Sequence, residues 1–403
     1  MVNQGQQPKI QVIERSSQSI SQFPDASNAK MIDLPQELLS SAQLTLGLFV
    51  LVDFAADGTI NLVLPACTTT DCRGGSFIFT YNFRTDVWSP LDVDWKPFGL
   101  PSEVAFTWSL TVTPKLDSGL AVSALVGPTV GDFDLDGKTD IGVALTYFLE
   151  SAPSEPVGSL PVVLLNQGRD SVTRHQKLSA FLLPGSQLPE KTTKVRQIAF
   201  FDLGERGSMD VFVGSINTLN IPAVQLFLQE MVNDFYFLKV TILNGLCSSA
   251  MDCADNRLPY GLPVPGLSSA YRTESADGRR VRSRGLLGVQ SCCGALQVPF
   301  AVYGLGPFAN YVEQVAVAIP PNSTGLRSLS IPAVVPNSEV FVNPYPHDDP
   351  ARYVLRIYMI SIGLSSFACS FRYMKLEPFR KKNTFGFAIQ VSLIQSFKQL
   401  LAH

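Results

Sequence analysis

The chain has 403 residues, of which 46% are hydrophobic and 16% are charged, and its formal net charge is −3. Because a negative net charge gives no attraction to phosphate backbones, we expect no nucleic-acid partner. The chain holds 29 Gly and 28 Pro residues, a density typical of many short strands and turns rather than of long solvated helices. We therefore predict an all-β protein.

Residues 1–40 show no clear pattern. They lack the basic start, the apolar centre and the small-residue cleavage site of a secretory signal peptide. We expect a divergent or partial N-terminal segment here, and we expect the chain to be incomplete at its N-terminus.

Within residues 41–245, three stretches share an apolar run, a short loop and a second apolar run. They are LVDFAADGTINLVL (51–64), VGDFDLDGKTDIGVAL (130–145) and FFDLGERGSMDVFVG (200–214). Each loop begins with Asp and has Gly at its sixth position. The apolar runs have the two-residue period or the continuous apolarity of strands. Recurrence at intervals of about 70 to 80 residues is typical of a repeat fold and predicts propeller blades.

The second loop has the residue types of a calcium site. In its D-x-D-x-D-G-x-x-D pattern, Asp132, Asp134 and Asp136 can converge on one cation. The main-chain carbonyl of Lys138 can point inward, and Asp140 can complete the shell with both oxygens. Because every ligand is an oxygen and the coordination number is flexible, the pattern favours Ca²⁺ over Mg²⁺.

Three other interpretations of this loop were weighed. An EF-hand needs Glu at the twelfth position and flanking helices, but the twelfth residue is Val143 in an apolar run. A pair of catalytic acids needs one carboxyl group in a less polar setting, which the loop does not offer. A solvated turn without a metal remains an alternative.

The first loop keeps part of this pattern. Asp53, Asp57 and Asn61 are present, but Ala55 takes the third position and removes one ligand. We predict a weak cation site in this loop.

The third loop departs further from the pattern. Gly204 and Arg206 stand where the second loop has acids. The Arg206 guanidinium can pair with Asp202 or Asp210 and so take the place of a cation. We predict that this loop binds no calcium.

Two pairs of cysteines enclose short polar stretches. Cys67 and Cys72 enclose TTTD, and Cys247 and Cys253 enclose SSAMD. A zinc site would need two such pairs close together or nearby histidines, and the chain has three His residues in all. Disulfides in an oxidising compartment are our prediction, and free thiols are the alternative. Asn322 lies in an N-S-T sequon that agrees with glycosylation outside the cytosol.

The C-terminal part is divided by composition. We predict a loop-rich insertion over 246–290 and a small β module over 291–350. IYMISIGLSSFACSF (357–371) is uncharged and is followed by basic residues. This pattern predicts a membrane helix over 354–372 and a basic cytosolic tail over 373–403, with a buried helix or strand pair as the alternative.

The pattern VGDFDLDGKTDIGVAL resembles the FG-GAP repeat of integrin α-chain β-propellers, of which about three to four blades are recognisable here. Longer stretches, among them LQVPFAVYGLGPFANYVEQVAVAIP and VVPNSEVFVNPYPHDDPARYVLRIY, resemble the T-cell immunomodulatory protein family, called linkin in its adhesion context. The resemblance implies a single-pass type I membrane protein with an extracellular propeller. It also implies a protein partner at the cell surface, in adhesion or in T-cell modulation.

Two further functions were considered. A hydrolase is not expected, because no G-x-S-x-G, H-E-x-x-H or Cys/His arrangement occurs. We therefore expect a non-enzymatic protein. A secreted glycan-binding propeller is the alternative, with Trp88, Trp95 and Trp108 as residues that could stack on sugar rings.

Overall fold

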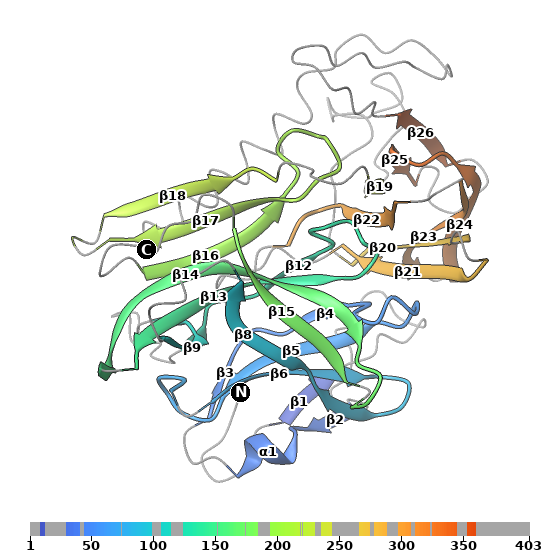
Figure 1. Cartoon of the computed structure of the whole chain (residues 1–403). Helices are drawn as coiled ribbons and strands as arrows, with labels where there is room; N and C mark the ends of the chain where they lie inside the picture. The colour runs from blue at the N-terminus through green and yellow to red at the C-terminus, as the bar shows by residue number, and fades with distance from the viewer. Residues whose placement is uncertain are drawn as a thin grey trace, which may run out of the picture.

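Short strands joined by turns make up nearly all of the chain that the computed structural model describes (Figure 1). The described residues are 9–12, 30–40, 44–73, 75–98, 106–113, 124–150, 152–173, 175–183, 194–217, 219, 221–229, 235–243, 266–274, 278–287, 297–307, 311–322, 325–344 and 353–359. Within them, α1 (Gln36–Leu39) is the single helix. The protein is all-β, as the composition predicts.

The N-terminal residues pack beneath the first sheet. Strand β1 (Lys9–Val12) pairs antiparallel with β2 (Lys30–Asp33), and α1 follows β2. Ile32 and Leu34 are buried against Leu62 and Leu64 of the first sheet. This apolar contact fixes the segment in place.

The first sheet contains the first aspartate loop. Its order is β3 (Thr45–Leu46), β5 (Asn61–Cys67), β6 (Ser76–Asn82) and β7 (Val87–Pro90), and β4 (Val50–Val52) also pairs with β5. Every residue of β5 is buried, which explains its continuous apolar run. The loop connects β4 to β5.

The second sheet contains the second loop and takes in strands from before it. Its own strands are β12 (Thr129–Gly131), β13 (Asp140–Leu149), β14 (Ala152–Arg169) and β15 (Gln176–Leu182). Strand β8 (Asp92–Phe98) pairs in parallel with β15, and β9 (Phe106–Leu110) lies beside β12 along the other edge of the sheet, on β13. The short strands β10 (Val112–Thr113) and β11 (Ala124–Leu125) pair with each other.

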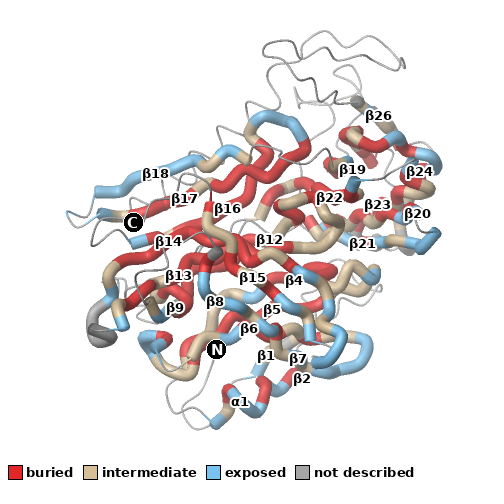
Figure 2. Tube along the Cα trace, viewed as in Figure 1, coloured by how far each residue is buried: buried red, intermediate tan, exposed pale blue. Residues whose placement is uncertain are grey.

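The third sheet is smaller. Its order is β16 (Lys194–Phe201), β17 (Asp210–Ile216) and β18 (Pro222–Phe227), and the third loop connects β16 to β17. The predicted strand–loop–strand repeat is therefore confirmed three times. Residues of the first and second sheets form one buried apolar cluster, and those of the second and third sheets form another together with residues 237, 298, 300 and 302. Figure 2 shows that the inner strands of these sheets are largely buried.

The C-terminal strands form a β-sandwich of two four-stranded sheets. One sheet has the order β22 (Ala301–Gly306), β19 (Tyr236–Ile242), β25 (Ser338–Asn343) and β26 (Val354–Met359). The other has the order β21 (Arg280–Leu286), β20 (Ser268–Glu274), β23 (Val312–Asn322) and β24 (Gly325–Val334). Apolar residues of both sheets share one buried core.

The sandwich differs from the division predicted by composition. The range 246–290, predicted as loop-rich, contains β20 and β21, and β20 pairs with β23. Strand β19 falls in the range predicted for propeller blades but pairs with β22 and β25. Because the partners in the β20–β23, β19–β22 and β19–β25 pairings are 39 or more residues apart in the sequence, local composition did not identify them.

The range 354–372, predicted as a membrane helix, begins with a strand. Its first six residues form strand β26, which pairs antiparallel with β25 at the edge of the sandwich. The remaining residues of that range, and the predicted tail over 373–403, lie outside the described residues. In the described part of the chain, no helix is long and apolar enough to cross a membrane.

Candidate metal-binding loop

The three aspartate loops share one backbone geometry. The fourth residue of each loop, Ala56, Leu135 or Glu205, has a φ angle of 51°, 61° or 51°, in the left-handed region. The sixth residue is Gly in all three, with φ between 80° and 89°. Two left-handed residues curl the chain tightly, and Gly adopts this conformation without steric cost. Each loop can therefore direct its side chains toward a common centre.

The first aspartate of each loop organises the turn. Asp53, Asp132 and Asp202 are all buried. In each case the Oδ2 atom accepts a hydrogen bond from the main-chain N–H of the Gly at the sixth position, over 2.7, 2.9 and 3.0 Å. These three aspartates thus have a structural role whether or not a cation is bound.

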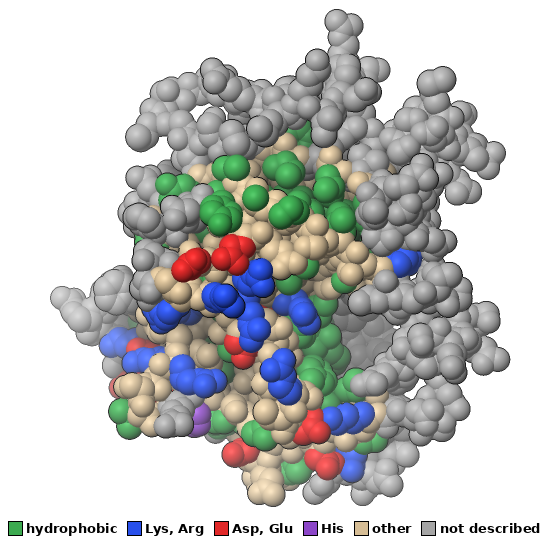
Figure 3. All heavy atoms as spheres, turned by 90° about the vertical axis from the view of Figure 1, so that its right-hand side faces the viewer, with side chains coloured by type: hydrophobic (Ala, Val, Ile, Leu, Met, Phe, Trp, Pro, Cys, Tyr) green, Lys and Arg blue, Asp and Glu red, His purple; other side chains and the backbone are tan. Residues whose placement is uncertain are grey.

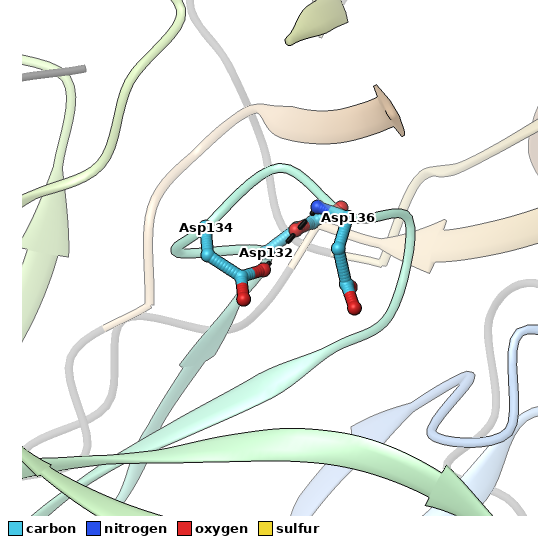
Figure 4. A group of neighbouring side chains, drawn as sticks. All are labelled: Asp132, Asp134 and Asp136. Carbon is cyan, nitrogen blue, oxygen red and sulfur yellow. Dashed lines mark hydrogen bonds between the residues drawn. The ribbon is translucent and has the colours of Figure 1, made fainter. Parts of the chain in front are cut away.

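The second loop brings three carboxylates together. Oxygens of Asp132, Asp134 and Asp136 lie within 4.8 Å of one another, inside the curve of one loop (Figure 4). Asp132 is 95% buried, yet its Oδ1 atom has no hydrogen-bond donor among the described residues. A buried acceptor without a partner is costly, and a cation would satisfy it. These residues therefore fit a hard metal ion.

The electrostatics of the second loop agree with this fit. Burial raises the pKa of Asp132 well above its ordinary value, and the like charges of Asp136 and Asp134 raise it further. The pKa of Asp134 is raised by burial and then by Asp136. In the metal-free loop, each carboxylate therefore raises the free energy needed to ionise the others. A bound divalent cation would offset this cost.

Lys138 lies at the rim of this group. Its Nζ atom forms an ion pair with Asp136 Oδ2, and its main-chain N–H donates to Asp136 Oδ1 over 2.8 Å. The side chain of Lys138 is 37% exposed, so its ammonium can turn toward solvent when another cation binds.

Asp140 has a different environment from the other three acids. Its Oδ2 atom accepts from the N–H of Phe133 and its Oδ1 atom accepts from the N–H of Asn166, both over 2.8 Å. Asp140 is therefore not part of the close group of carboxylates; it ties the loop to strand β14. Asp210 makes the same two kinds of contact in the third loop, to Leu203 and Gln229.

The first loop does not form an acidic group. Asp53 Oδ1 accepts from the N–H of Asp57 over 3.1 Å, and Asp57 Oδ1 accepts from the N–H of Thr59 over 2.8 Å. Asn61 is buried and its Oδ1 atom has no donor in the described part of the chain. The carboxylate oxygens of this loop are thus largely used by the turn itself.

The third loop contains its own positive charge. The Arg206 guanidinium donates to Asp210 Oδ1 over 3.1 Å, which is one of the two pairings that the sequence predicts. The main-chain N–H of Arg206 donates to Asp202 Oδ1 over 2.8 Å. No group of three metal-ligating residues is found in this loop, which is wholly described.

Comparison with known proteins places the chain. A family model for the C2 domain of ITFG1 matches residues 259–358, the range that holds β20 to β25 and most of β26. A T-cell immunomodulatory protein of Macaca fascicularis is 32% identical over 243 residues, which cover 57% of this chain and 73% of that protein. The chain belongs to the T-cell immunomodulatory protein family.

Longer members of the family are also similar to this chain. The T-cell immunomodulatory protein of Rattus norvegicus is 32% identical over 314 residues, covering 76% of this chain and 48% of that protein. The Homo sapiens protein is 28% identical over 346 residues, covering 83% and 52%. This member of the T-cell immunomodulatory protein family therefore spans about half the length of these two relatives.

The remaining predicted sites in this family member lie away from the loops. Cys67 and Cys72 are joined by a disulfide at the end of β5, whereas Cys247 and Cys253 lie outside the described residues. Asn322 is the last residue of β23, opposite Gly325 of β24. Asn322 is thus placed at the end of a hairpin strand.

Sequence reasoning missed three residues that contact the loops from the sandwich. They are Lys239 on β19, Arg284 on β21 and Gly304 on β22. None lies near an aspartate loop in the sequence, and no local motif marks Lys239 or Arg284. Gly304 stands out only as one of two glycines in the stretch VYGLG.

Proposed function

We propose that the second loop binds Ca²⁺ through Asp132, Asp134 and Asp136. The observation that carries this proposal is the partnerless Oδ1 atom of buried Asp132 beside two further carboxylates. The carbonyl of Lys138 and the carboxylate of Asp140 remain ligands that the sequence motif predicts. A bound Ca²⁺ would supply positive charge and rigidity to the loop and no chemical step.

Isothermal titration calorimetry of the full chain with Ca²⁺ tests the calcium site. We expect binding with a Kd on the order of 10⁻⁴ to 10⁻³ M, as in extracellular modules. Asp134→Ala or Asp136→Ala should abolish the heat, because each removes one of three converging carboxylates. Asp57→Ala, the matched change in the first loop, should leave this site unaltered. Absence of binding up to millimolar calcium, or unchanged heat in both second-loop variants, would contradict the proposal.

We also propose that the three loop-bearing sheets are blades of an FG-GAP β-propeller in a non-enzymatic cell-surface protein. Membership of the T-cell immunomodulatory protein family and the three equivalent loops support this role. In this proposal calcium stiffens the blades, and a protein partner binds the exposed surface in adhesion or T-cell modulation. A pull-down tests this proposal, with the soluble ectodomain as bait and surface-biotinylated T cells as the source of the partner. If no biotinylated protein is captured specifically at any calcium concentration, the result would count against it.

Attachment to a membrane as a single-pass type I protein is part of the same proposal. The glycosylation sequon at Asn322 and the Cys67–Cys72 disulfide fit an extracellular position for the sheets. Surface labelling of expressing cells, followed by alkaline extraction, tests the attachment. Release of the protein into the soluble fraction would refute it.

The tryptophans do not favour the glycan-binding alternative. Trp88 donates its Nε1–H to the carbonyl of Asp33 over 2.8 Å and packs on Tyr81. Trp95 and Trp108 pack against the core shared by the first and second sheets. Each indole is thus used in holding segments of the chain together.

A further inference from the structure

The same carboxylate oxygen in each loop contacts the C-terminal sandwich. Besides the N–H of its own glycine, the Oδ2 atom of each first aspartate accepts one donor from a sandwich strand. The donors are Arg284 N to Asp53 (3.1 Å), Gly304 N to Asp132 (2.7 Å) and Lys239 Nζ to Asp202 (3.0 Å). Three equivalent atoms of three repeats therefore meet one domain.

The contact at the second loop is very close. A Cβ atom on Gly304 would lie 2.3 Å from the carbonyl carbon and oxygen of Leu135, so only Gly fits here. The N–H of Gly306 donates to the Leu135 carbonyl over 3.1 Å, and the Tyr271 hydroxyl donates to the carbonyl of Gly304 over 3.3 Å. The backbone of β22 thus lies directly on the acidic loop.

The contact at the third loop is a buried ion pair. Lys239 is 4% exposed, and its ammonium lies 3.0 Å from Asp202 Oδ2 and 3.4 Å from Glu339 Oε1. It also lies 4.6 Å from the centre of the Phe300 ring, in a cation–π contact. A buried ammonium with two carboxylate partners places the sandwich specifically on this loop.

The contact at the first loop is formed by a basic strand. Arg280, Arg282 and Arg284 are exposed along β21. Figure 3 shows Lys and Arg side chains gathered on one face of the molecule. The side chain of Arg282 lies beside Gly58, at the sixth position of the first loop. Positive charge therefore lies close to the loop that has Asp53 and Asp57.

We propose that the three aspartate loops together are the docking site for the C-terminal sandwich, and that a cation in the second loop tightens this docking through Asp132. The second half of this inference rests on the proposed calcium site. Asp132 faces both partners: Oδ2 accepts from Gly304, Oδ1 is buried without a donor among the described residues, and the carboxylate lies beside those of Asp134 and Asp136. Without a cation, repulsion among the carboxylates favours loosening of the loop, and Leu135 and Asp132 would loosen with it. A bound cation holds both in the position that Gly304 and Gly306 require.

The amide of Gly304 reports this coupling directly, because its N–H is the docking donor. We expect millimolar calcium to slow its hydrogen exchange in the full chain at least about fivefold relative to EDTA, the lower end of usual coupling between sites. The amide of Arg284, which donates to the first loop, reports the same docking at a second place and should slow by a smaller factor. Amides of the fully buried strand β5 are the internal control and should change least. An Asp134→Asn/Asp136→Asn variant should show no calcium effect at Gly304, since the ligands are lost but Asp132 remains.

The outcomes separate the two proposals. If calorimetry detects no calcium binding, the proposed metal site fails. If calcium binds but the exchange of Gly304 is unchanged, or slows equally at Gly304, at Arg284 and in the sheet cores, the coupling is refuted. The docking role itself is tested with Gly304→Ala, which should speed exchange of the Arg284 amide on a different strand; an unchanged Arg284 rate in a folded variant would overturn it.

Discussion

Asp132 and its equivalents in the other loops differ in the partner of one oxygen. In the first and third loops, Oδ1 of the first aspartate accepts the N–H of the fifth residue, Asp57 or Arg206. In the second loop the corresponding N–H, that of Asp136, donates instead to Asp134 Oδ1 over 3.2 Å. The acid at the third position therefore withdraws a donor from Asp132 and leaves its Oδ1 atom for a cation.

This difference predicts how a metal site can be gained. The third position of the first loop is Ala55, which has no acceptor. Ala55→Asp should redirect the N–H of Asp57 to the new carboxylate and free Asp53 Oδ1. We expect calorimetry to show two calcium sites instead of one. Gly204→Asp is the control in the third loop, where the Arg206 guanidinium remains beside Asp210 and should prevent binding; an unchanged stoichiometry in Ala55→Asp would contradict the argument.

Strand β18 differs from the corresponding strands of the first two sheets in having one edge without a partner strand in the described part of the chain. In the first two sheets the corresponding strands, β6 and β14, are covered by a fourth strand, β7 or β15. In the part of the chain that the structure describes, β18 pairs only with β17, and residues 211–229 contain no charged side chain. Exposed, uncharged edge strands invite pairing with another chain.

We therefore predict that β18 promotes self-association. Val224 is 47% exposed in the middle of the strand, and Val224→Lys should place a charge there and reduce association. Sedimentation velocity over a range of concentrations measures the effect. Val172→Lys is a matched control, because Val172 is 87% exposed in a turn away from any sheet edge. A wild-type chain that stays monomeric at all concentrations would refute the prediction.

At the scale of the whole molecule, Lys239 joins the third sheet to the sandwich. Burial acts to lower its pKa, but the charges of Glu339 and Asp202 outweigh this and raise it. A lysine whose pKa is raised on folding adds stability at every pH below its unfolded value of about 10.5, and this stability is lost only as pH rises through the folded value. Lys239 therefore keeps its positive charge at neutral pH.

Removal of this charge should loosen the sandwich. Lys239→Met keeps an unbranched apolar side chain but leaves Asp202 and Glu339 buried without a cation, at a cost of roughly 3 to 5 kcal/mol. With EDTA present, differential scanning calorimetry of Lys239→Met should show a lower Tm than that of the wild type. It should also show separate unfolding transitions for the three loop-bearing sheets and for the sandwich. Lys239→Arg should retain most of the wild-type Tm. A single transition at the wild-type Tm in Lys239→Met would contradict the assigned role.

Local features of the fold could be predicted from the sequence, and distant contacts could not. The loop from Asp132 to Asp140 was recognisable because its four aspartates and its glycine lie within nine residues. Its contacts with the sandwich were not, because Gly304 lies 172 residues from Asp132 and Arg284 lies 231 residues from Asp53. Asp140 fits the ligand motif equally well in sequence, yet the N–H groups of Phe133 and Asn166 give it a structural role. The apolar run beginning at Val354 suggested a helix, whereas pairing with β25 makes its first residues a strand.

The pairing of β8 and β9 with the second sheet has a consequence for how such repeats can be copied. In the sequence, the recognisable motif begins with the apolar run before Asp132. In the fold, β8 covers one edge of this sheet and β9 lies along the other, and both come from residues 92–110. A gene duplication that copied only residues 124–182 would yield a sheet without either of these strands. The segment that forms this sheet with all its strands is therefore longer than the visible motif and begins at Asp92.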